Sequence, residues 1–164
     1  MDRETDIEVL YREHGAALVL FATAMLGDRG CAQDVVHRVF AKLLEKGIHG
    51  NIVDSKAYLF SCVRNAALND LKSAARLVEL QPETAWFEQS SRDHVAELNL
   101  QSALRQLPDD QKQIVVLHIW GELSFLQISE VLAINANTTA SRYRYALKKL
   151  RELMQAQEKC HANI

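Results

Sequence analysis

Glycine and proline are scarce in this chain, and this scarcity restricts its fold more than any other feature. Only 6 glycines and 2 prolines occur among 164 residues, whereas a protein made of many short strands needs such residues at most of its turns. Leucine, alanine, glutamate, glutamine, lysine and arginine, which favour helices, are plentiful. We therefore predict an all-α protein.

Size and composition narrow the architecture further. A length of 164 residues allows one ordinary domain or two small ones and excludes a large catalytic barrel. Hydrophobic residues make up 48% and charged residues 24%, which is the balance of a folded globular protein. The net charge of -2 gives no global reason to expect a nucleic-acid binder, so that function must rest on local charge.

The N-terminus and the cysteines indicate the cellular setting. The chain opens with acidic and polar residues, and we identify no stretch that approaches the roughly 18 to 20 apolar residues of a membrane span. We expect a cytoplasmic protein without membrane insertion. Cys31, Cys62 and Cys160 are widely spaced and lack the C-x-x-C pattern of zinc sites, so no metal site and no cofactor are predicted.

Charge is unevenly distributed along the chain. Residues 1–76 hold ten basic and ten acidic side chains, residues 77–99 hold one and five, and residues 100–164 hold eight and six. The acidic middle segment contains Pro82 and has the weakest periodicity, as a linker does. It also carries Trp86 and Phe87, which we expect to dock on the protein itself in preference to a partner.

Apolar residues recur at helical spacing in the first part. One amphipathic pattern runs from Thr5 to Gly27, and a second, the most regular, runs from Gly30 to Gly47. The segment 47–55 reads as a loop whose Asp54 or Ser55 caps a third helix that ends near Arg76. The second part predicts a helix over 100–107 and, after Pro108, another that reaches Gly121.

The pattern after Gly121 is the most informative. Ser124 can cap a short helix, residues 133–135 form a turn, and a final helix begins near Asn137. Two short helices joined by a tight turn indicate a helix-turn-helix.

The final helix has two separable faces. Thr139, Tyr143, Ala146, Leu147 and Leu150 follow an inward-facing spacing, and five basic residues without an acidic one occupy residues 142–151. A solvated helix end, favoured by the macrodipole, explains residues 148–151 equally well. It explains Arg142 and Arg144 less well, because they lie near the helix N-terminus, where phosphate and major-groove contacts are made.

These residues match a known family. The stretch LRQLPDDQKQIVVLHIWGELSFLQISEVLAINANTTASRYRYALKKLR closely resembles region 4 of bacterial extracytoplasmic-function (ECF) sigma factors. GDRGCAQDVVHRVFAKLLEK resembles region 2.2, and AYLFSCVRNAALNDLKSAAR resembles the helix of regions 2.3 and 2.4. The stretches stand in the family's order and together extend over most of the chain.

The resemblance implies two small helical domains joined by a linker. Residues 1–76 would be sigma region 2, 77–99 the acidic linker, and 100–164 the region 4 helix-turn-helix. It implies an initiation factor without an active site of its own, so no catalytic residue is expected. The implied partners are core RNA polymerase, promoter DNA and an anti-sigma factor.

The resemblance also assigns candidate site residues. Those expected to bind polymerase are Asp34, Val35, His37, Arg38 and Phe40. Those expected at the minus 10 element, with the 47–55 loop, are Arg64, Asn65, Asn69, Lys72 and Arg76. Those expected at the minus 35 element are Asn137, Thr138, Ser141, Arg142, Arg144, Tyr145 and Lys148.

Four residues depart from the family pattern. His37 and Arg38 stand where Gln-Glu is usual, so the polymerase-facing surface has exchanged a negative charge for a positive one. Ala133 stands where a glycine is frequent, and Gln127 where an acidic residue is frequent. Both of these remain compatible with a helix-turn-helix.

Two other function classes compete with this interpretation. A helix-turn-helix regulator that acts without being a polymerase subunit would use the same C-terminal half, but it leaves the first half unexplained. An enzyme is disfavoured because the histidines and acids show no Ser-His-Asp, H-E-x-x-H, P-loop or paired-ligand spacing.

Overall fold

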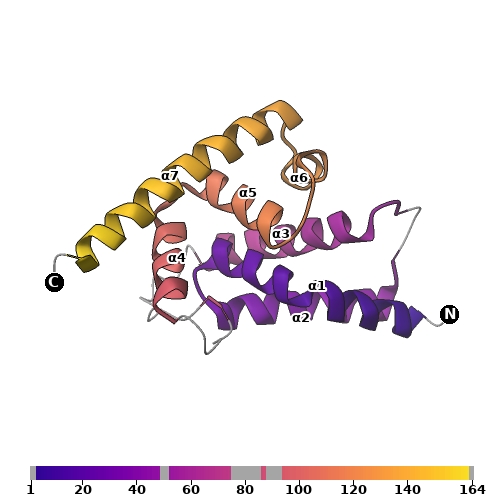
Figure 1. The fold of residues 1–164 in the computed structure, drawn as a ribbon. Coiled ribbons are helices and arrows are strands. Elements are labelled where there is room, and N and C mark those ends of the chain that lie inside the picture. Colours follow the sequence, from indigo (N-terminus) through magenta and orange to yellow (C-terminus); the bar gives the residue numbers. More distant parts are fainter. Residues whose placement is uncertain (1–2, 49–51, 75–85, 88–93, 163–164) are drawn as a thin grey trace.

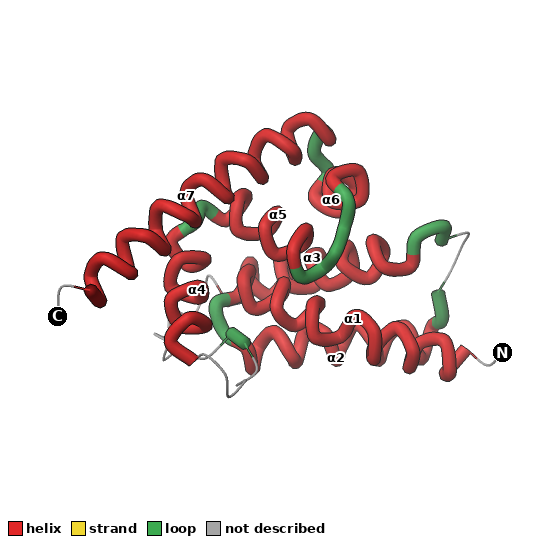
Figure 2. Tube along the Cα trace, viewed as in Figure 1, coloured by secondary structure: helices red, strands yellow, loops and turns green. Residues whose placement is uncertain are grey.

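The computed structural model describes residues 3–48, 52–74, 86–87 and 94–162, and within these residues it contains helices and no strand (Figures 1 and 2). This confirms the predicted all-α class. The seven helices are α1 (Arg3–Leu26), α2 (Arg29–Lys46), α3 (Ser55–Ala74), α4 (His94–Gln106), α5 (Asp109–Ile119), α6 (Phe125–Leu132) and α7 (Ala136–Ala162).

The first three helices pack into one bundle. α1 lies against both α2 and α3, and α2 also contacts α3. Phe21 of α1 and Phe60 of α3 meet edge to face, with ring centroids 5.8 Å apart, and both side chains are fully buried. The periodicity predicted all three helices. α2 begins at Arg29, next to the expected start after Gly30, and Asp28 before it accepts a hydrogen bond from the Gly30 amide.

The apolar character of α1 was underestimated from the sequence. Residues Asp6–Leu26 are long and apolar enough to cross a membrane by length and composition. The same segment packs against α2, α3 and α5, and Leu18, Phe21 and Ala22 within it are fully buried. This is the packing of a core helix. A core helix can be as long and as apolar as a membrane-spanning helix, so length and composition do not distinguish the two.

The second half contains four helices, and their buried apolar side chains belong to the same hydrophobic core as those of the first three helices. α7 contacts α4, α5 and α6 along its length. α4 starts at His94, earlier than the predicted start at residue 100 and inside the segment assigned to the linker. Within α4, Ala103 and Leu104 are fully buried, and the helix packs against α7.

Trp86 is docked on the second half of the chain. Its side chain is 3% exposed, and its backbone N–H donates to Oε1 of Gln101 over 2.9 Å. The cationic groups of Arg105 and Lys112 lie over its ring, 5.4 and 5.9 Å from the centroid. The expectation that this tryptophan docks on the protein itself is confirmed.

The helix-turn-helix forms where the sequence predicted it. Ser124 Oγ accepts from the Gln127 amide, and the Gln127 side chain accepts from the Ser124 amide, which completes a capping box. Ala133 ends α6 in the left-handed conformation, with φ 54° and ψ 46°. Asn135 Oδ1 then accepts from the Asn137 amide at the start of α7.

Replacing Ala133 by glycine is expected to raise the free energy of unfolding by about 0.5–1 kcal/mol. The left-handed conformation costs a residue with a Cβ roughly 1–2 kcal/mol, and the greater freedom of glycine in the unfolded chain cancels part of that gain. Urea unfolding followed by circular dichroism measures the difference. Ala140→Gly, inside α7, is the control and should lower stability by about 1 kcal/mol. A destabilised Ala133→Gly variant would contradict the prediction.

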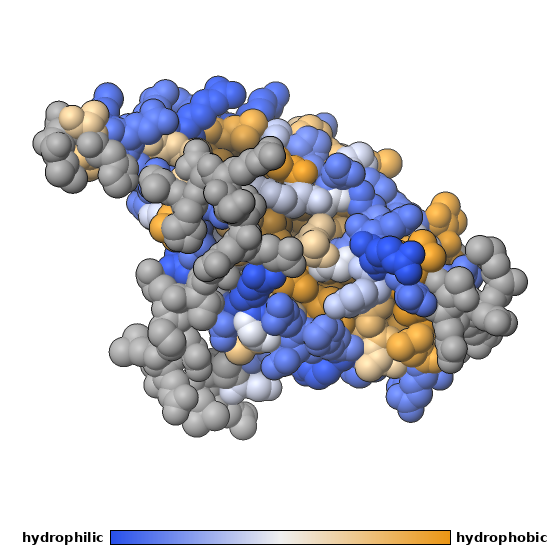
Figure 3. Space-filling view, turned by 60° about the horizontal axis from the view of Figure 1, so that its bottom comes forward, coloured by the Kyte–Doolittle hydropathy of each residue, from blue (hydrophilic) through white to orange (hydrophobic). Residues whose placement is uncertain are grey.

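The two halves lie against each other. α1 contacts α5, and α3 contacts α6 (Figure 1). Hydrophilic side chains cover much of the face in Figure 3, with apolar residues gathered in smaller patches between them.

Candidate functional site

The N-terminal half of α7 exposes the side chains predicted for the minus 35 element. Asn137, Arg144, Tyr145 and Lys148 are exposed, and Tyr145 is 68% exposed although it is aromatic. Thr138, Ser141 and Arg142 are half-buried. On the opposite face, the buried residues are Thr139, Ala146 and Leu150. The predicted division of this helix into two faces is therefore confirmed.

The two arginines of this helix differ in their surroundings. Arg142 Nε lies 3.6 Å from Oδ2 of Asp110 in α5, so this side chain also ties α7 to α5. Arg144 Nη2 lies 3.4 Å from Oγ of Ser141, one turn earlier on the same exposed face. Arg144 is thus the more accessible of the two cations.

An aromatic cluster joins α5, α6 and α7 and holds them in register. The His118 ring stacks on Phe125 with centroids 4.7 Å apart and meets Tyr143 edge to face at 4.6 Å. His118 Nδ1 lies 2.8 Å from the Leu123 carbonyl oxygen, which fixes the loop before α6. Sequence reasoning assigned His118 only to a helix. Its supporting role depends on the meeting of α5, α6 and α7.

A polar strip runs along α3. Asn65, Asn69 and Lys72 are exposed at spacings of four and three, so they share one face. Arg64 is half-buried beside them. The predicted Arg76 lies outside the described residues. The structure therefore brings together three of the five residues predicted for the minus 10 element.

On α2, the structure separates the predicted polymerase residues into two groups. Asp34, His37 and Arg38 are exposed. Val35 is 0% and Phe40 5% exposed, so they cannot provide a contact surface. Their assignment as contact residues is corrected, because both belong to the apolar stripe by which α2 packs on the bundle. Their role is to position the helix.

The exposed α2 residues line a shallow depression with Cys31 and Asp70. Arg38 forms an ion pair with Asp70 of α3, and His37 Nε2 lies 3.2 Å from the hydroxyl of Tyr11. A hydrogen bond to the Asp28 carboxylate raises the pKa of the Cys31 thiol, as burial does to a smaller extent. The thiol thus stays protonated and is a poor metal ligand.

Metal binding has no support in the described part of the chain. No group of three or more histidine, cysteine, aspartate or glutamate side chains there is placed to hold an ion.

Polar contacts join the start of α3 to the helix-turn-helix. Gln127 Nε2 donates to Oδ2 of Asp54 over 2.5 Å, and Lys56 Nζ donates to the Glu122 carbonyl oxygen over 3.2 Å. Asp54 Oδ1 also accepts from the Ala57 amide, so it caps α3 as predicted. The amide of Gln127, followed by that of Ala57, lowers the pKa of the Asp54 carboxyl.

His14 of α1 lies near the same contacts. Burial lowers the pKa of its imidazole, and the positive charge of Lys56 adds to the effect, whereas the carboxylates of Glu13, Asp54 and Glu122 oppose it. The neutral imidazole is the form that this interface favours.

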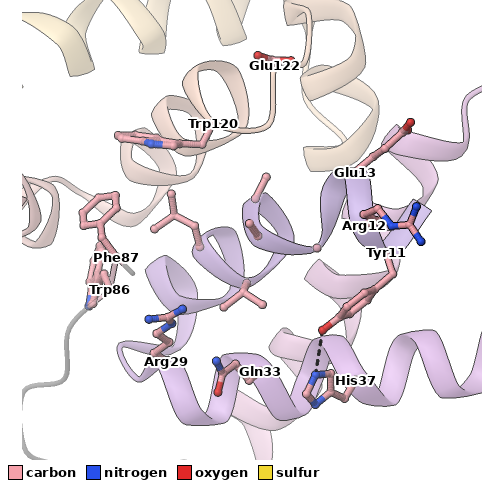
Figure 4. A pocket seen from close by; sticks show the side chains of 15 residues that line it. Tyr11, Arg12, Glu13, Arg29, Gln33, His37, Trp86, Phe87, Trp120 and Glu122 are labelled. Carbon is pink, nitrogen blue, oxygen red and sulfur yellow. Dashed lines mark hydrogen bonds between the residues drawn. The ribbon is translucent and has the colours of Figure 1, made fainter. Parts of the chain in front are cut away.

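A groove of about 640 Å³ lies beside this interface (Figure 4). Residues of α1 and α2 form one wall, and the other contains Trp86, Phe87, Trp120 and Glu122. Phe87 and Trp120 have ring centroids 5.7 Å apart, so the described part of the linker contributes to the groove. The groove is therefore lined by both halves of the chain.

Two family matches account for both halves. The family described as Sigma-70 region 2 matches residues 10–77, and the family described as Sigma-70, region 4 matches residues 97–150. The chain belongs to the sigma-70 family. The region 4 match contains α5, α6 and the N-terminal half of α7, and the region 2 match contains α2 and α3.

Individual relatives place this sigma factor in the ECF group. The ECF RNA polymerase sigma factor SigL of Mycobacterium tuberculosis is 29% identical over 160 residues, which cover 91% of this chain and 89% of SigL. The RNA polymerase sigma-E factor of Streptomyces antibioticus is 26% identical over 159 residues, with coverage of 93% and 87%. These matches extend over both regions.

A solved structure shares the fold. The sigma factor RpoE of Bartonella quintana, in complex with the anti-sigma factor NepR, superposes with a TM-score of 0.77 at 20% identity. The superposition covers 92% of this chain and 97% of RpoE.

The protein is thus an ECF sigma factor that directs promoter-specific transcription initiation, as a non-catalytic partner of core RNA polymerase and promoter DNA. A regulator that acts without joining the polymerase is set aside, because the region 2 match accounts for the first half.

Proposed function

We propose that the exposed face of α7 reads the minus 35 element. The observation that carries this proposal is the exposure of Arg144, Tyr145 and Lys148 on a helix whose opposite face is buried. The second helix of a helix-turn-helix enters the major groove, where arginine pairs with guanine edges and aromatic or apolar groups contact thymine methyls.

The strip on α3 is proposed to contact the minus 10 element. Asn65 and Asn69 offer paired donors and acceptors to unstacked base edges, and Lys72 offers a charge to the phosphates. The 47–55 loop precedes this strip, and its Asp54 caps α3.

The exposed face of α2 is the proposed polymerase-binding surface, with Asp34, His37 and Arg38 at its centre. The positive charge that replaces the usual acid sits here, so partner preference among polymerases is expected to depend on it. The ion pair between Arg38 and Asp70 also orients Arg38, which makes Asp34 the cleaner probe.

Run-off transcription tests the proposed function as a whole. Purified protein and core polymerase are incubated with a promoter fragment library, and the transcript starts are sequenced. We expect starts that share one sequence about 10 and another about 35 base pairs upstream. Starts that share neither sequence would overturn the assignment of the two DNA-reading surfaces.

Reversing the charge of Asp34 is expected to weaken binding to core polymerase by about tenfold, because charge complementarity across an interface is lost. Fluorescence anisotropy of the labelled protein, titrated with core polymerase, measures the affinity. Glu45→Lys, an exposed change three turns further along α2, is the matched control and should have little effect. Equal affinities of Asp34→Lys and the wild type would contradict the surface assigned here.

The domain limits and further partners complete the proposal. We propose region 2 over 1–76, a linker over 77–99 that includes the docked Trp86 and the first turns of α4, and region 4 over 100–164. The protein is proposed to act in the cytoplasm, as the family typically does. The anti-sigma complex of the Bartonella quintana relative supports the proposal that an anti-sigma factor binds this chain too.

A further inference from the structure

The two proposed DNA-reading surfaces are joined to each other in this structure. Asp54 belongs to the loop that precedes α3, and Gln127 lies in α6, the first helix of the helix-turn-helix. The 2.5 Å hydrogen bond between their side chains connects segments that are far apart in sequence. The nearby bond from Lys56 to the Glu122 carbonyl oxygen ties the same two elements.

In this arrangement the two DNA-reading surfaces lie too close together to reach both promoter elements at once. The minus 10 and minus 35 elements are separated by about 25 base pairs, or about 85 Å of B-form DNA. The N-terminal half of α7 follows α6 after a turn of only a few residues, and α6 touches α3. At a rise of 1.5 Å per residue, α3 with 20 residues, α6 with 8 and the first half of α7 together span about 60 Å even when laid end to end. The two surfaces therefore cannot reach both elements of one straight promoter until α6 separates from α3.

Gln127 performs two tasks in this contact. Its Oε1 accepts from the Ser124 amide and completes the capping box of α6, while its Nε2 donates to the Asp54 carboxylate. A glutamate would serve the capping box equally well. It would place a second carboxylate against Asp54, and like charges at this distance repel. The neutral amide is therefore what allows α6 to rest on the loop.

We propose that the Gln127–Asp54 hydrogen bond is a latch that holds region 4 against the minus 10 loop in the free protein and opens before promoter binding. The inference rests on the proposed assignment of the two DNA-reading surfaces.

Exchanging the two chemical groups tests the latch. Gln127→Glu removes the donor and retains the cap, and Asp54→Asn removes the acceptor while its Oδ1 can still cap α3. In the double variant, the asparagine amide can donate to the new carboxylate. We expect each single change to shift the ratio of closed to open protein about tenfold toward the open form, and the double change to restore it.

Small-angle X-ray scattering of the full-length chain reports the opening as a larger radius of gyration. Hydrogen exchange at the start of α3 and in α6 reports it independently. Leu126→Glu adds the same charge at a side chain on α6 that is 64% exposed, so it controls for net charge and should leave both measurements unchanged.

Recovery of compactness in the double variant supports the latch. Single variants with wild-type scattering and exchange overturn it, as does a double variant that stays as open as the single ones. If Gln127→Glu does not fold, the comparison of Asp54→Asn with the wild type, by scattering and hydrogen exchange, is sufficient to test the latch. Failure of the proposed function is distinguishable, because wild-type holoenzyme would then give no shared upstream elements in run-off transcription, whatever the scattering shows.

Discussion

Replacing Trp86 by alanine is expected to lower the free energy of unfolding by about 3–5 kcal/mol, which is the range for truncation of a large buried aromatic side chain. The indole is 3% exposed and lies under the cationic groups of Arg105 and Lys112. Truncation leaves a cavity and removes two cation–π contacts, each worth roughly 0.5–1 kcal/mol or more when desolvated. Chemical unfolding followed by circular dichroism measures the loss.

Two control variants show whether the loss of stability is specific to the buried Trp86 ring. Phe87→Ala changes the next residue, which is half-buried, and should cost clearly less. Trp86→Phe keeps an aromatic ring over which both cations can lie, and should retain part of the stability. If Trp86→Ala is as stable as the wild type, the docked position of this segment contributes nothing to the fold of region 4.

Replacing Arg144 by alanine is expected to weaken promoter binding of the polymerase complex by roughly 1–3 kcal/mol and to relax the preference at one position of the minus 35 element. Arg144 is exposed and only weakly tied to Ser141, so it is free to form a bidentate contact with a guanine. Tyr145→Ala removes an aromatic surface that is 68% exposed and is expected to act at a neighbouring base.

The measurement is promoter affinity at several salt concentrations, on matched and scrambled minus 35 elements. Lys148→Ala should weaken binding equally on both and reduce the salt slope by about one unit, as the loss of a phosphate contact does. Arg142→Ala should also loosen α7 from α5, since Arg142 lies 3.6 Å from Asp110. The free energy of unfolding of this variant is therefore measured as well, to separate a loss of DNA contact from a loss of stability. Arg151→Ala, two turns further along α7, is the control.

Unchanged affinity and sequence preference in both Arg144→Ala and Tyr145→Ala would show that this face is only a solvated helix face. The sequence left a dipole-stabilised helix end open as an alternative, but α7 continues to Ala162, so residues 142–151 lie well before its last turn, where the macrodipole acts. Exposure of Tyr145 adds an observation that the dipole does not explain.

Local patterns in the sequence determined the class, the order of the helices and the helix-turn-helix. Ser124 and Asp54 cap the helices they were predicted to cap, because capping depends on a side chain and amides only two or three residues away. The two faces of α7 were also predictable, since Thr139, Ala146 and Leu150 recur at helical spacing.

The tertiary structure alone decided how these elements meet. Helical spacing shows which residues share a face but not which neighbour covers it, and so Val35 and Phe40 were assigned to a contact surface although they are buried. The docking of Trp86 depends on side chains of α4 and α5 that the weak local periodicity of its segment does not specify. The bond between Asp54 and Gln127 joins residues 73 positions apart, and no local pattern encodes such a contact, because its energy is realised only once the two halves have packed.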